Sequence, residues 1–401
     1  MPEFQPAPGV RLFIIDDGAV VYAHAAQKIY AFNTAATFIW CGLELGQNRE
    51  EVAGQLAATS GIALGEAQRR VSDAVDSWRG LGLLGEGASL EVRQPRRRSR
   101  RRPQGRPASA LPGYAEARFV EDRVYALLSA AVRVRYGSAE QRDYVHPILA
   151  HLENRHAPST LDIKLIDDGG THHVCRNGSV EASLDSVDRI GPVVKWLVWE
   201  AAVNTHQFLL DIHAGVVGDG EGVMLFPARA GSGKSSLTAA LSRAGFDYFS
   251  DEIALLEEPG LTVRPIPLAI CVKSTGWDLM APYFPGLPTL KSHRRGDGKT
   301  VRYVPPPPLG KGSDPSRSYP VRRIVFPRYE ADAKTALKPL PRVEALRRLL
   351  EECLVVPVPL TQRRAGRLVR WIKQIDCYEL PMSSLEEAVD LVRSASMPSS
   401  L

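Results

Sequence analysis

Short apolar runs and amphipathic segments alternate over the first 90 residues. The first two runs flank Asp16-Asp17-Gly18, a sequence typical of a hairpin turn. Asn33 follows the third run and is a favourable N-cap for a helix. The apolar spacing then becomes helical, so we expect three strands followed by three helices, as in a small winged-helix-like domain. The expected strands are 12–15, 20–22 and Lys28–Phe32, and the expected helices run from Asn33 through Trp40, over about 48–60 and over Leu64–Gly80.

Beyond residue 113 the pattern mixes strands with helices. Residues 115–134 open this part with a segment whose period does not separate strand from helix. Residues 208–213 and 223–226 are apolar runs joined by a glycine-rich segment, which predicts two adjacent strands. The other expected elements are a hairpin at 163–175, a helix at 190–203, strands at 246–250 and 324–326, and helices at about 343–354, 362–375 and 384–395.

Length and composition place the chain among globular proteins. With 401 residues and a hydrophobic content of 44%, it is expected to form two or three domains. The first residues lack a basic segment followed by an apolar core, and no apolar run approaches the ~20 residues that cross a bilayer. The five cysteines are scattered without Cys-x-x-Cys pairing, which is typical of reduced thiols. We therefore expect a cytoplasmic protein without a membrane partner.

Residues 91–113 carry a concentrated positive charge. Eight arginines stand there against one glutamate, so the net charge of +5 leaves the rest of the chain slightly acidic. Pro, Ser and Gly surround these arginines, which indicates a linker between domains. The alternative is a surface for nucleic acid, but no aromatic residues are interleaved for base stacking. Nucleic acid is therefore the less favoured partner.

The sequence around residues 223–241 has the parts of a phosphate-binding loop: an apolar strand, a loop and an amphipathic helix. The loop fits the pattern G-x-x-x-x-G-K-S, except that Ala228 stands at the first glycine. Its N–H groups and the following helix N-terminus suit a β-phosphate. Lys234 can reach the β- and γ-phosphates, and Ser235 is placed for Mg²⁺. The expected nucleotide-binding residues are Ala228, Gly231, Ser232, Gly233, Lys234, Ser235 and Ser236.

Two adjacent carboxylates, Asp251 and Glu252, follow the next expected strand and stand close behind the loop in sequence. Transport ATPases place their acidic strand far downstream and carry a Leu-Ser-Gly-Gly-Gln signature, which is absent from this sequence. Two carboxylates beside a phosphate-binding loop can divide two tasks, metal binding and removal of a proton from an attacking hydroxyl. The alternative is a pair of solvated carboxylates at a strand end.

The N-terminal pattern resembles the PqqD family, the peptide-recognition domains of enzymes that modify ribosomally made peptides. That family typically binds a leader peptide as an added strand beside its third strand and against its last helix. Strand addition is physically reasonable because an edge strand offers unpaired backbone groups. The resemblance covers about residues 12–84 and rests on the sequences at 30–40, 49–52 and 82–84. The implied leader groove consists of Lys28–Phe32 and the Leu64–Gly80 helix, with Arg69, Arg70 and Asp73.

The phosphate-binding stretch resembles the HPr kinase/phosphorylase family, whose catalytic domain is related to phosphoenolpyruvate carboxykinases. The resemblance spans about residues 115–391 and is strongest over 211–255. It implies that Asp251 is the general base, that His213 tunes the site or contacts phosphate, and that Glu252 is a second metal or positioning group. The sequence departs from the family in having Asp-Glu for its usual Asp-Asp and no counterpart of its later Glu-x-Arg-Gly stretch. The matching residues are His213-Ala214, 223–226, Ala228 to Ser235, and Asp251-Glu252.

These patterns predict a multidomain protein of the α+β and α/β classes. A PqqD-like domain is expected over 10–90, an Arg/Pro-rich linker over 91–113, and an HPr kinase-like catalytic domain with C-terminal helices over 114–401. The expected catalytic residues are Asp251, His213 and Lys234, and the expected metal ligands are Ser235, Glu252 and Asp251. Residues 292–302 are basic and 305–320 are rich in Pro, Gly and Ser, so these segments are expected to form either a partly basic lid over the phosphates or ordinary surface loops. The candidate charge-stabilising residues are Lys273, Arg302 and Arg328.

The expected activity is that of an ATP- and Mg²⁺-dependent kinase. Its substrate would be a Ser or Thr hydroxyl of a precursor peptide whose leader is bound by the N-terminal domain. A nucleotide-dependent peptide chaperone without phosphotransfer and a kinase of a small metabolite are the alternatives. The sequence leaves open the choice of ATP or GTP, the acceptor residue, and whether the chain forms a homo-oligomer.

Overall fold

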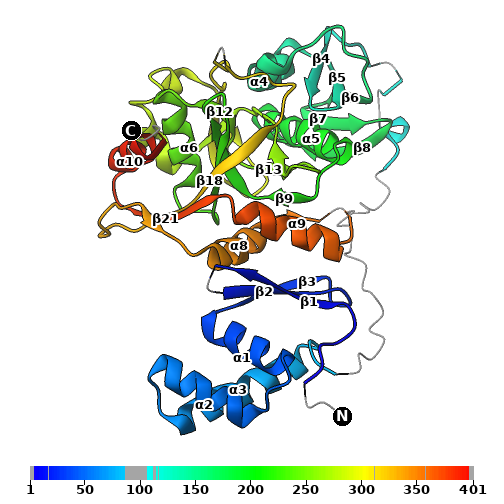
Figure 1. Cartoon of the computed structure of the whole chain (residues 1–401). Coiled ribbons are helices and arrows are strands. Elements are labelled where there is room, and N and C mark those ends of the chain that lie inside the picture. The colour runs from blue at the N-terminus through cyan, green and yellow to red at the C-terminus, as the bar shows by residue number, and fades with distance from the viewer. Residues whose placement is uncertain are drawn as a thin grey trace. The chain divides into compact units, whose positions relative to one another are not determined.

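The computed structural model describes residues 4–16, 18–85, 106–111, 114–115, 117–310, 312–356 and 358–396. The chain divides into two compact units, Met1–Arg97 with Pro339–Tyr378, and Arg98–Lys338 with Glu379–Leu401. Both contain helices and strands (Figure 1), so the expectation of a multidomain protein with mixed α and β structure is confirmed. Most of the expected linker, residues 91–105, lies outside the described residues.

A three-stranded antiparallel sheet and three helices form the N-terminal part of the first unit. The side chain of Asn33 accepts a hydrogen bond from the Ala36 N–H at 2.8 Å and caps the first helix. Asn48 and Glu51 form a capping box at the second. The expected strands and helices are therefore confirmed. They are β1 Val10–Ile15, β2 Gly18–Ala23, β3 Lys28–Phe32, α1 Thr34–Glu44, α2 Arg49–Ser60 and α3 Leu64–Gly80.

Three aromatic rings lie at the centre of this part of the first unit. Phe32 is stacked on Trp78 with ring centroids 5.0 Å apart, and Trp40 meets Trp78 edge-on at 5.1 Å. All three side chains are buried. Aromatic pairs in these geometries add ~0.5–1.5 kcal/mol beyond the burial of their area. Phe32 and Trp40 are therefore core residues that hold the sheet on the helices.

Two helices from residues 339–378 cover the other face of the same sheet (Figure 1). Helix α8 (Arg342–Glu351) packs against β2 and β3, and α9 (Gln362–Ile372) packs against β1 and β2. All residues of β2 are buried because helices lie on both of its faces. The Tyr22 hydroxyl donates a hydrogen bond to the Leu360 carbonyl. Sequence analysis placed both helices in the catalytic domain, whereas the structure groups them with the N-terminal strands.

Five strands in the order β4–β5–β6–β7–β8 form one sheet of the second unit. Strands β5 and β6 run parallel and are joined through α4, since parallel neighbours need a crossover connection. Residues 115–134, for which the sequence left strand and helix open, contribute strands. The elements are β4 Glu121–Leu127, β5 Ala130–Tyr136, α4 Ala139–Leu149, β6 Leu161–Asp168, β7 Thr171–Arg176, β8 Ser179–Leu184 and α5 Ile190–Thr205.

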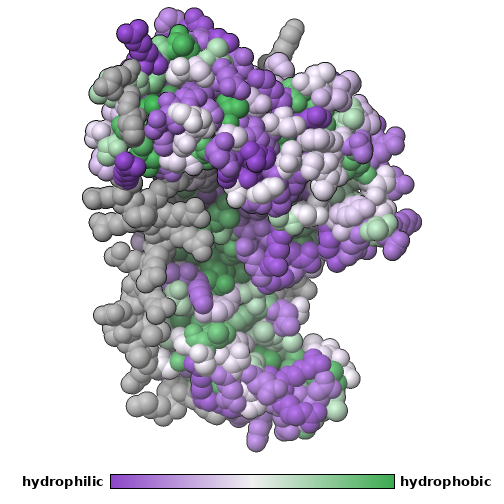
Figure 2. Space-filling model, turned by 180° about the vertical axis from the view of Figure 1, so that it is seen from behind, coloured by the Kyte–Doolittle hydropathy of each residue, from purple (hydrophilic) through white to green (hydrophobic). Residues whose placement is uncertain are grey.

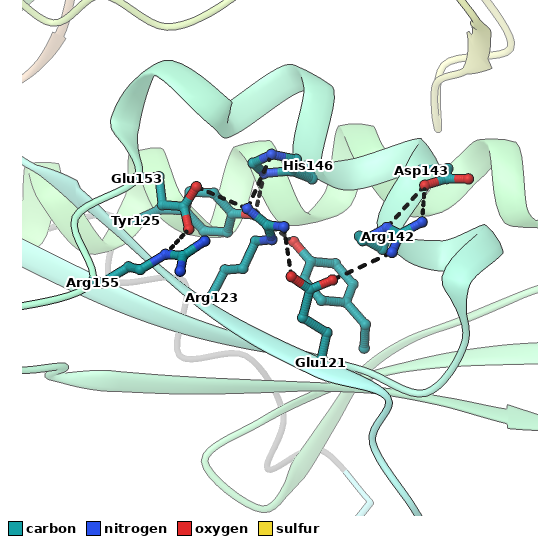
Figure 3. Close-up of polar contacts among 9 residues, drawn as sticks. Glu121, Arg123, Tyr125, Arg142, Asp143, His146, Glu153 and Arg155 are labelled. Carbon is teal, nitrogen blue, oxygen red and sulfur yellow. Dashed lines mark hydrogen bonds and ion pairs between the residues drawn. The ribbon is translucent and has the colours of Figure 1, made fainter.

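A polar network fastens α4 to β4 (Figure 3). The Arg123 guanidinium lies 2.5 Å from Glu121 Oε1 and 2.9 Å from Glu153 Oε2. The Tyr125 hydroxyl lies 3.1 Å from His146 Nδ1. Burial and the nearby Arg123 lower the pKa of His146, so its ring is neutral near pH 7. The network therefore joins helix and strand through one ionic centre and one neutral imidazole.

The stretch over residues 223–241, which is expected to bind phosphate, belongs to a second sheet, in which β12, β10, β11, β18 and β21 are successive neighbours. Strand β11 is antiparallel to β10 and parallel to β18, and α6 packs on β10 and β12. The elements are β9 Leu210–Ile212, β10 Ala214–Gly218, β11 Val223–Pro227, α6 Lys234–Arg243, β12 Asp247–Ser250, β13 Ala254–Leu256, β18 Tyr319–Tyr329 and β21 Asp376–Met382.

The expected pairing of residues 208–213 with 223–226 is wrong. Strand β9 pairs with β13, and the neighbour of β11 is β10. The hairpin forms from the residues next to the glycine-rich turn, Gly218 against Val223, and the apolar run before the turn is long enough to supply two strands. His213 therefore lies between two strands that belong to different sheets.

Residues 292–302, expected in a lid or a surface loop, form two strands of a small sheet in the order β15–β17–β16. The last helix begins after Ser384, whose hydroxyl accepts a hydrogen bond from the Glu387 N–H at 3.3 Å. The remaining elements are β14 Thr262–Val263, β15 Ile270–Lys273, α7 Trp277–Met280, β16 Ser292–Arg294, β17 Thr300–Val304, β19 Lys338–Pro339, β20 Cys353–Val355 and α10 Leu385–Ser396.

The surface carries hydrophilic residues over the outward side of α2 and α3, in the lower part of Figure 2. Their buried residues, including Val52, Leu56, Val71 and Val75, face the core of the first unit. None of the helices in the described part of the chain has both the length and the apolar character of a membrane-spanning segment.

Candidate functional site

A cavity of about 690 Å³ lies beside the phosphate-binding loop in the second unit. This volume is within the range of ligand-binding clefts. The loop, the start of α6, the turn after β12, strand β15 and the residues before α10 line it. Ala228 is buried and does not line the cavity. The other residues expected to be catalytic or to bind nucleotide or metal all line it: His213, Gly231, Ser232, Gly233, Lys234, Ser235, Ser236, Asp251 and Glu252.

The loop has the backbone of an anion-binding turn. Gly231 and Gly233 take positive φ angles of 92° and 86°, which favour glycine. Ala228 does not take a positive φ, so an alanine is tolerated there without strain. Helix α6 begins at Lys234, and the first N–H groups of a helix have no partner within it. The loop therefore fits a phosphate group bound by backbone donors at a helix N-terminus.

The Lys234 side chain is held at the cavity wall by two contacts. Its ammonium donates to the backbone oxygen of Asp251 at 2.7 Å and lies 3.1 Å from Nε2 of His213. Burial and the Lys234 charge lower the pKa of His213 to about 4, so the imidazole is neutral near pH 7. Because an ammonium is only a donor, the neutral ring accepts at Nε2 and carries its proton on Nδ1. His213 therefore orients the loop lysine.

Asp251 is the buried carboxylate of the acidic pair. The residue is 4% exposed, and Oδ1 accepts a 2.8 Å hydrogen bond from the Tyr248 hydroxyl. Burial and the neighbouring Glu252 raise the pKa of Asp251, while Lys195 and Lys234 act in the opposite direction. A carboxylate with a raised pKa is a better proton acceptor, so the placement of Asp251 suits a general base.

Glu252 is the carboxylate that faces the cavity, with 49% of its side chain exposed. Its Oε2 lies 3.1 Å from Nζ of Lys195, a residue of α5 that is 6% exposed. The Lys195 charge lowers the pKa of Glu252, which therefore remains ionised. Sequence analysis missed Lys195. The available signal was a lysine placed among apolar residues in a helix expected to be buried.

The candidate charge-stabilising residues separate in the structure. Lys273 lines the cavity, whereas the guanidinium of Arg302 lies 3.9 Å from the centre of the Trp277 ring. Arg328 instead forms an ion pair with Glu330 at 2.9 Å. The cavity wall is rich in positive charge, which suits an anionic ligand such as a triphosphate. The cationic residues that line it are Arg229, Lys234, Lys273, Arg295 and Lys299.

Ser235, Asp251 and Glu252, which all carry oxygen donors, line the same cavity. Mg²⁺ commonly takes one or two carboxylates from the protein and completes its shell with substrate phosphates and water. This donor set therefore fits Mg²⁺ bound together with a nucleotide. Within the described residues, no group of three or more His, Cys, Asp or Glu side chains is arranged to hold a metal ion.

The implied leader groove lies in the first unit. Strand β3 is at the end of its sheet, and in the described part of the chain it pairs only with β2. Arg69, Arg70 and Asp73 are exposed on α3. The structure therefore leaves one edge of β3 available to an added strand. A cavity of about 250 Å³ beside β3 is lined by Val20, Ile29, Ala31, Leu346, Arg347, Leu350 and Glu351.

No protein-family model matches the chain, and no curated protein matches it. Among solved structures, the chain is similar to one described as TbiB1 in complex with the TbiA(beta) leader peptide, with 21% sequence identity and a TM-score of 0.20. The match covers 20% of this chain and 93% of the other chain.

Proposed function

We propose that the protein is an ATP- and Mg²⁺-dependent kinase that phosphorylates a Ser or Thr hydroxyl of a ribosomally made precursor peptide. One observation carries the proposal. The buried residue Asp251 lines the same cavity as the loop, and its backbone oxygen accepts a hydrogen bond from the loop lysine. A proton acceptor and a phosphate-binding lysine in one cavity are the two groups that phosphoryl transfer to an alcohol requires.

In the proposed reaction, the acceptor oxygen forms a bond to the γ-phosphorus while the bond from that phosphorus to the bridging oxygen of the leaving diphosphate breaks. Asp251 takes the hydroxyl proton, and ADP leaves. Lys234 and the loop N–H groups bind the phosphates, and His213 orients Lys234. Mg²⁺, when bound, would neutralise charge on the transferred and leaving phosphates.

A peptide substrate is supported by the first unit. The free edge of β3 can pair with an extended peptide, and the exposed charges of α3 can select among leader sequences. A leader bound to the same chain raises the concentration of the acceptor segment at the active site. We therefore assign recognition to the first unit and chemistry to the second.

The decisive experiment incubates the protein with ATP, Mg²⁺ and a precursor peptide encoded beside its gene. Intact-mass measurement should show the gain of one phosphate. Lys234→Ala and Asp251→Asn should abolish the gain. Asp143→Asn is the matched control, because this half-exposed carboxylate on α4 pairs with Arg142 at 2.8 Å and does not line the cavity.

The variants also separate the alternatives. A peptide chaperone would show no mass gain and would tolerate Asp251→Asn, because it needs no proton acceptor. A kinase of a small metabolite would consume ATP with a metabolite pool and leave every neighbouring peptide unchanged. Failure of all neighbouring peptides to gain phosphate would count against the proposal.

A further inference from the structure

We propose that Lys195 is a positioning residue. It fixes the carboxylate of Glu252 at the cavity wall, and this carboxylate would bind Mg²⁺ there. This inference rests on the proposed function, since the metal accompanies the nucleotide. Lys195 belongs to neither the loop nor the acidic pair, and its helix α5 is distant from both in sequence.

The position of Lys195 is unusual for a lysine. It lies on α5 next to Val194, in a helix that contributes to the apolar core of the five-stranded sheet. Its ammonium leaves this core to reach Glu252 Oε2 at 3.1 Å and lies 5.5 Å from the centre of the Tyr303 ring. Burying a lysine costs free energy, and an apolar side chain would pack in the same place. A functional demand at Glu252 explains why a lysine stands there.

A side-chain contact that fixes the carboxylate matters more for Glu252 than for Asp251. Asp251 is buried and receives a hydrogen bond from Tyr248. Glu252 has a longer side chain that is half exposed to the cavity. Its backbone N–H donates to Ser250 Oγ at 3.2 Å, which fixes the backbone and leaves the carboxylate free to rotate. In the described residues, Lys195 supplies the polar contact to that carboxylate.

Each carboxylate of the pair thus has its own support from a different element, β12 for Asp251 and α5 for Glu252. Groups that hold a metal ligand in place typically change metal affinity by about 10–100-fold when they are removed. A similar loss is expected here, because an unanchored Glu252 would spend part of its time in rotamers that point away from the metal.

The test measures binding of Mn²⁺, a paramagnetic substitute for Mg²⁺, in the presence of ADP by electron paramagnetic resonance. Lys195→Met should weaken Mn²⁺ binding by about 10-fold or more. Glu252→Gln should weaken it at least as much, and the double variant should bind no more weakly than Glu252→Gln alone. Arg302→Met is the control, since this cation stacks on Trp277 and does not line the cavity, and it should leave Mn²⁺ affinity unchanged.

Thermal unfolding of each variant shows whether it is folded. Methionine should be accepted at residue 195, because the Glu252 side chain left without its partner is 49% exposed and can be solvated, so it is not a buried unpaired charge. Lys195→Gln serves in its place if Lys195→Met does not fold. Unchanged Mn²⁺ affinity in a folded Lys195 variant, or losses that simply add in the double variant, would overturn the inference. Absence of Mn²⁺ and ADP binding in the unmodified protein would instead overturn the proposed function.

Discussion

The hydroxyl of Tyr248 donates a 2.8 Å hydrogen bond to Oδ1 of Asp251, and both residues are buried. This bond stabilises the ionised carboxylate and lowers the pKa of Asp251, against the effect of burial.

Tyr248→Phe should therefore raise the pKa of Asp251. A base with a higher pKa is protonated over a wider range of acidic pH, so the acid limb of the profile of kcat/KM against pH should move to higher pH. Loss of the bond should also lower the free energy of unfolding by about 1.5–3 kcal/mol. Phosphate transfer at a series of pH values and denaturant unfolding measure the two effects. An unshifted acid limb would remove Asp251 from the role of base.

Substitution of the loop glycines should separate backbone strain from crowding. Gly231→Ala and Gly233→Ala each place an alanine at a positive φ, which costs about 1–2 kcal/mol. At Gly233 the added methyl would also lie 2.3 Å from Met382 Cε, whereas nothing lies within 4 Å at Gly231. We expect Gly233→Ala to lose more affinity for ADP in the presence of Mg²⁺.

Calorimetric titration with ADP and Mg²⁺ checks this order. Adding Met382→Ala to Gly233→Ala should restore the part of the ADP affinity that is lost through crowding. The part that is lost through the strained positive φ at residue 233 should remain lost. Equal losses for the two single variants, with no recovery, would show that Met382 does not restrict the loop.

Asp211 should make stability depend on pH. It is 1% exposed, its Oδ1 has no hydrogen-bond partner among the residues that the structure describes, and burial raises its pKa to about 7. The unfolded chain releases this proton near pH 4, so the folded state holds a proton that the unfolded state has lost between about pH 4 and 7. Stability from this group is therefore present at low pH and falls as pH rises through that window.

Asp211→Asn removes this dependence, because an amide cannot ionise. The variant should gain stability relative to the unmodified protein by up to about 4 kcal/mol at pH 8, and by much less at pH 5. Thermal unfolding at both pH values provides the measurement. A gain of the same size at pH 5 and pH 8 would contradict the assignment of a raised pKa to Asp211.

The charges on α3 should affect leader binding. Arg69→Glu with Arg70→Glu reverses two exposed charges beside the proposed groove and should change the affinity for a fluorescent leader peptide by about 10-fold. Arg79→Glu, at an exposed position in the last turn of the same helix, is the control. Fluorescence anisotropy reports both. If the unmodified protein, the double variant and Arg79→Glu bind the leader peptide with equal affinity, the leader does not bind beside Arg69 and Arg70.

The local parts of the site could be predicted from sequence because they are contiguous. The loop residues, the helix start at Lys234 and the strand before Asp251 follow one another along the chain, and the structure has them in that order. The pairings of β9 and the position of Lys195 could not be predicted, since both depend on contacts between segments distant in sequence. The period of the apolar residues indicates which face of a helix or strand is buried, but it does not indicate which segment packs against that face.

The grouping of α8 and α9 with the first three strands was hidden for the same reason. A local sign did exist, since residues 19–23 are apolar at every position and predict a strand covered on both faces. Three helices from residues 34–80 can cover only one of these faces. Another segment could therefore be expected to pack on the second face of the sheet. The spacing of apolar residues did not show that residues 342–372 supply this segment.

The packing of α8 and α9 on the N-terminal sheet determines how this part of the first unit can be engineered. A fragment ending at residue 85 would expose Val20 and Tyr22, which in the whole chain face residues of 339–378. Such a fragment should aggregate or bind unrelated apolar surfaces. Transplanting this part of the first unit to another protein therefore requires two separate segments of the gene, joined by a designed connection. A single recombination event would transfer the N-terminal strands and helices without α8 and α9. The sheet in the recipient protein would then have one apolar face exposed, and α8 and α9 in the donor protein would have no sheet to pack on.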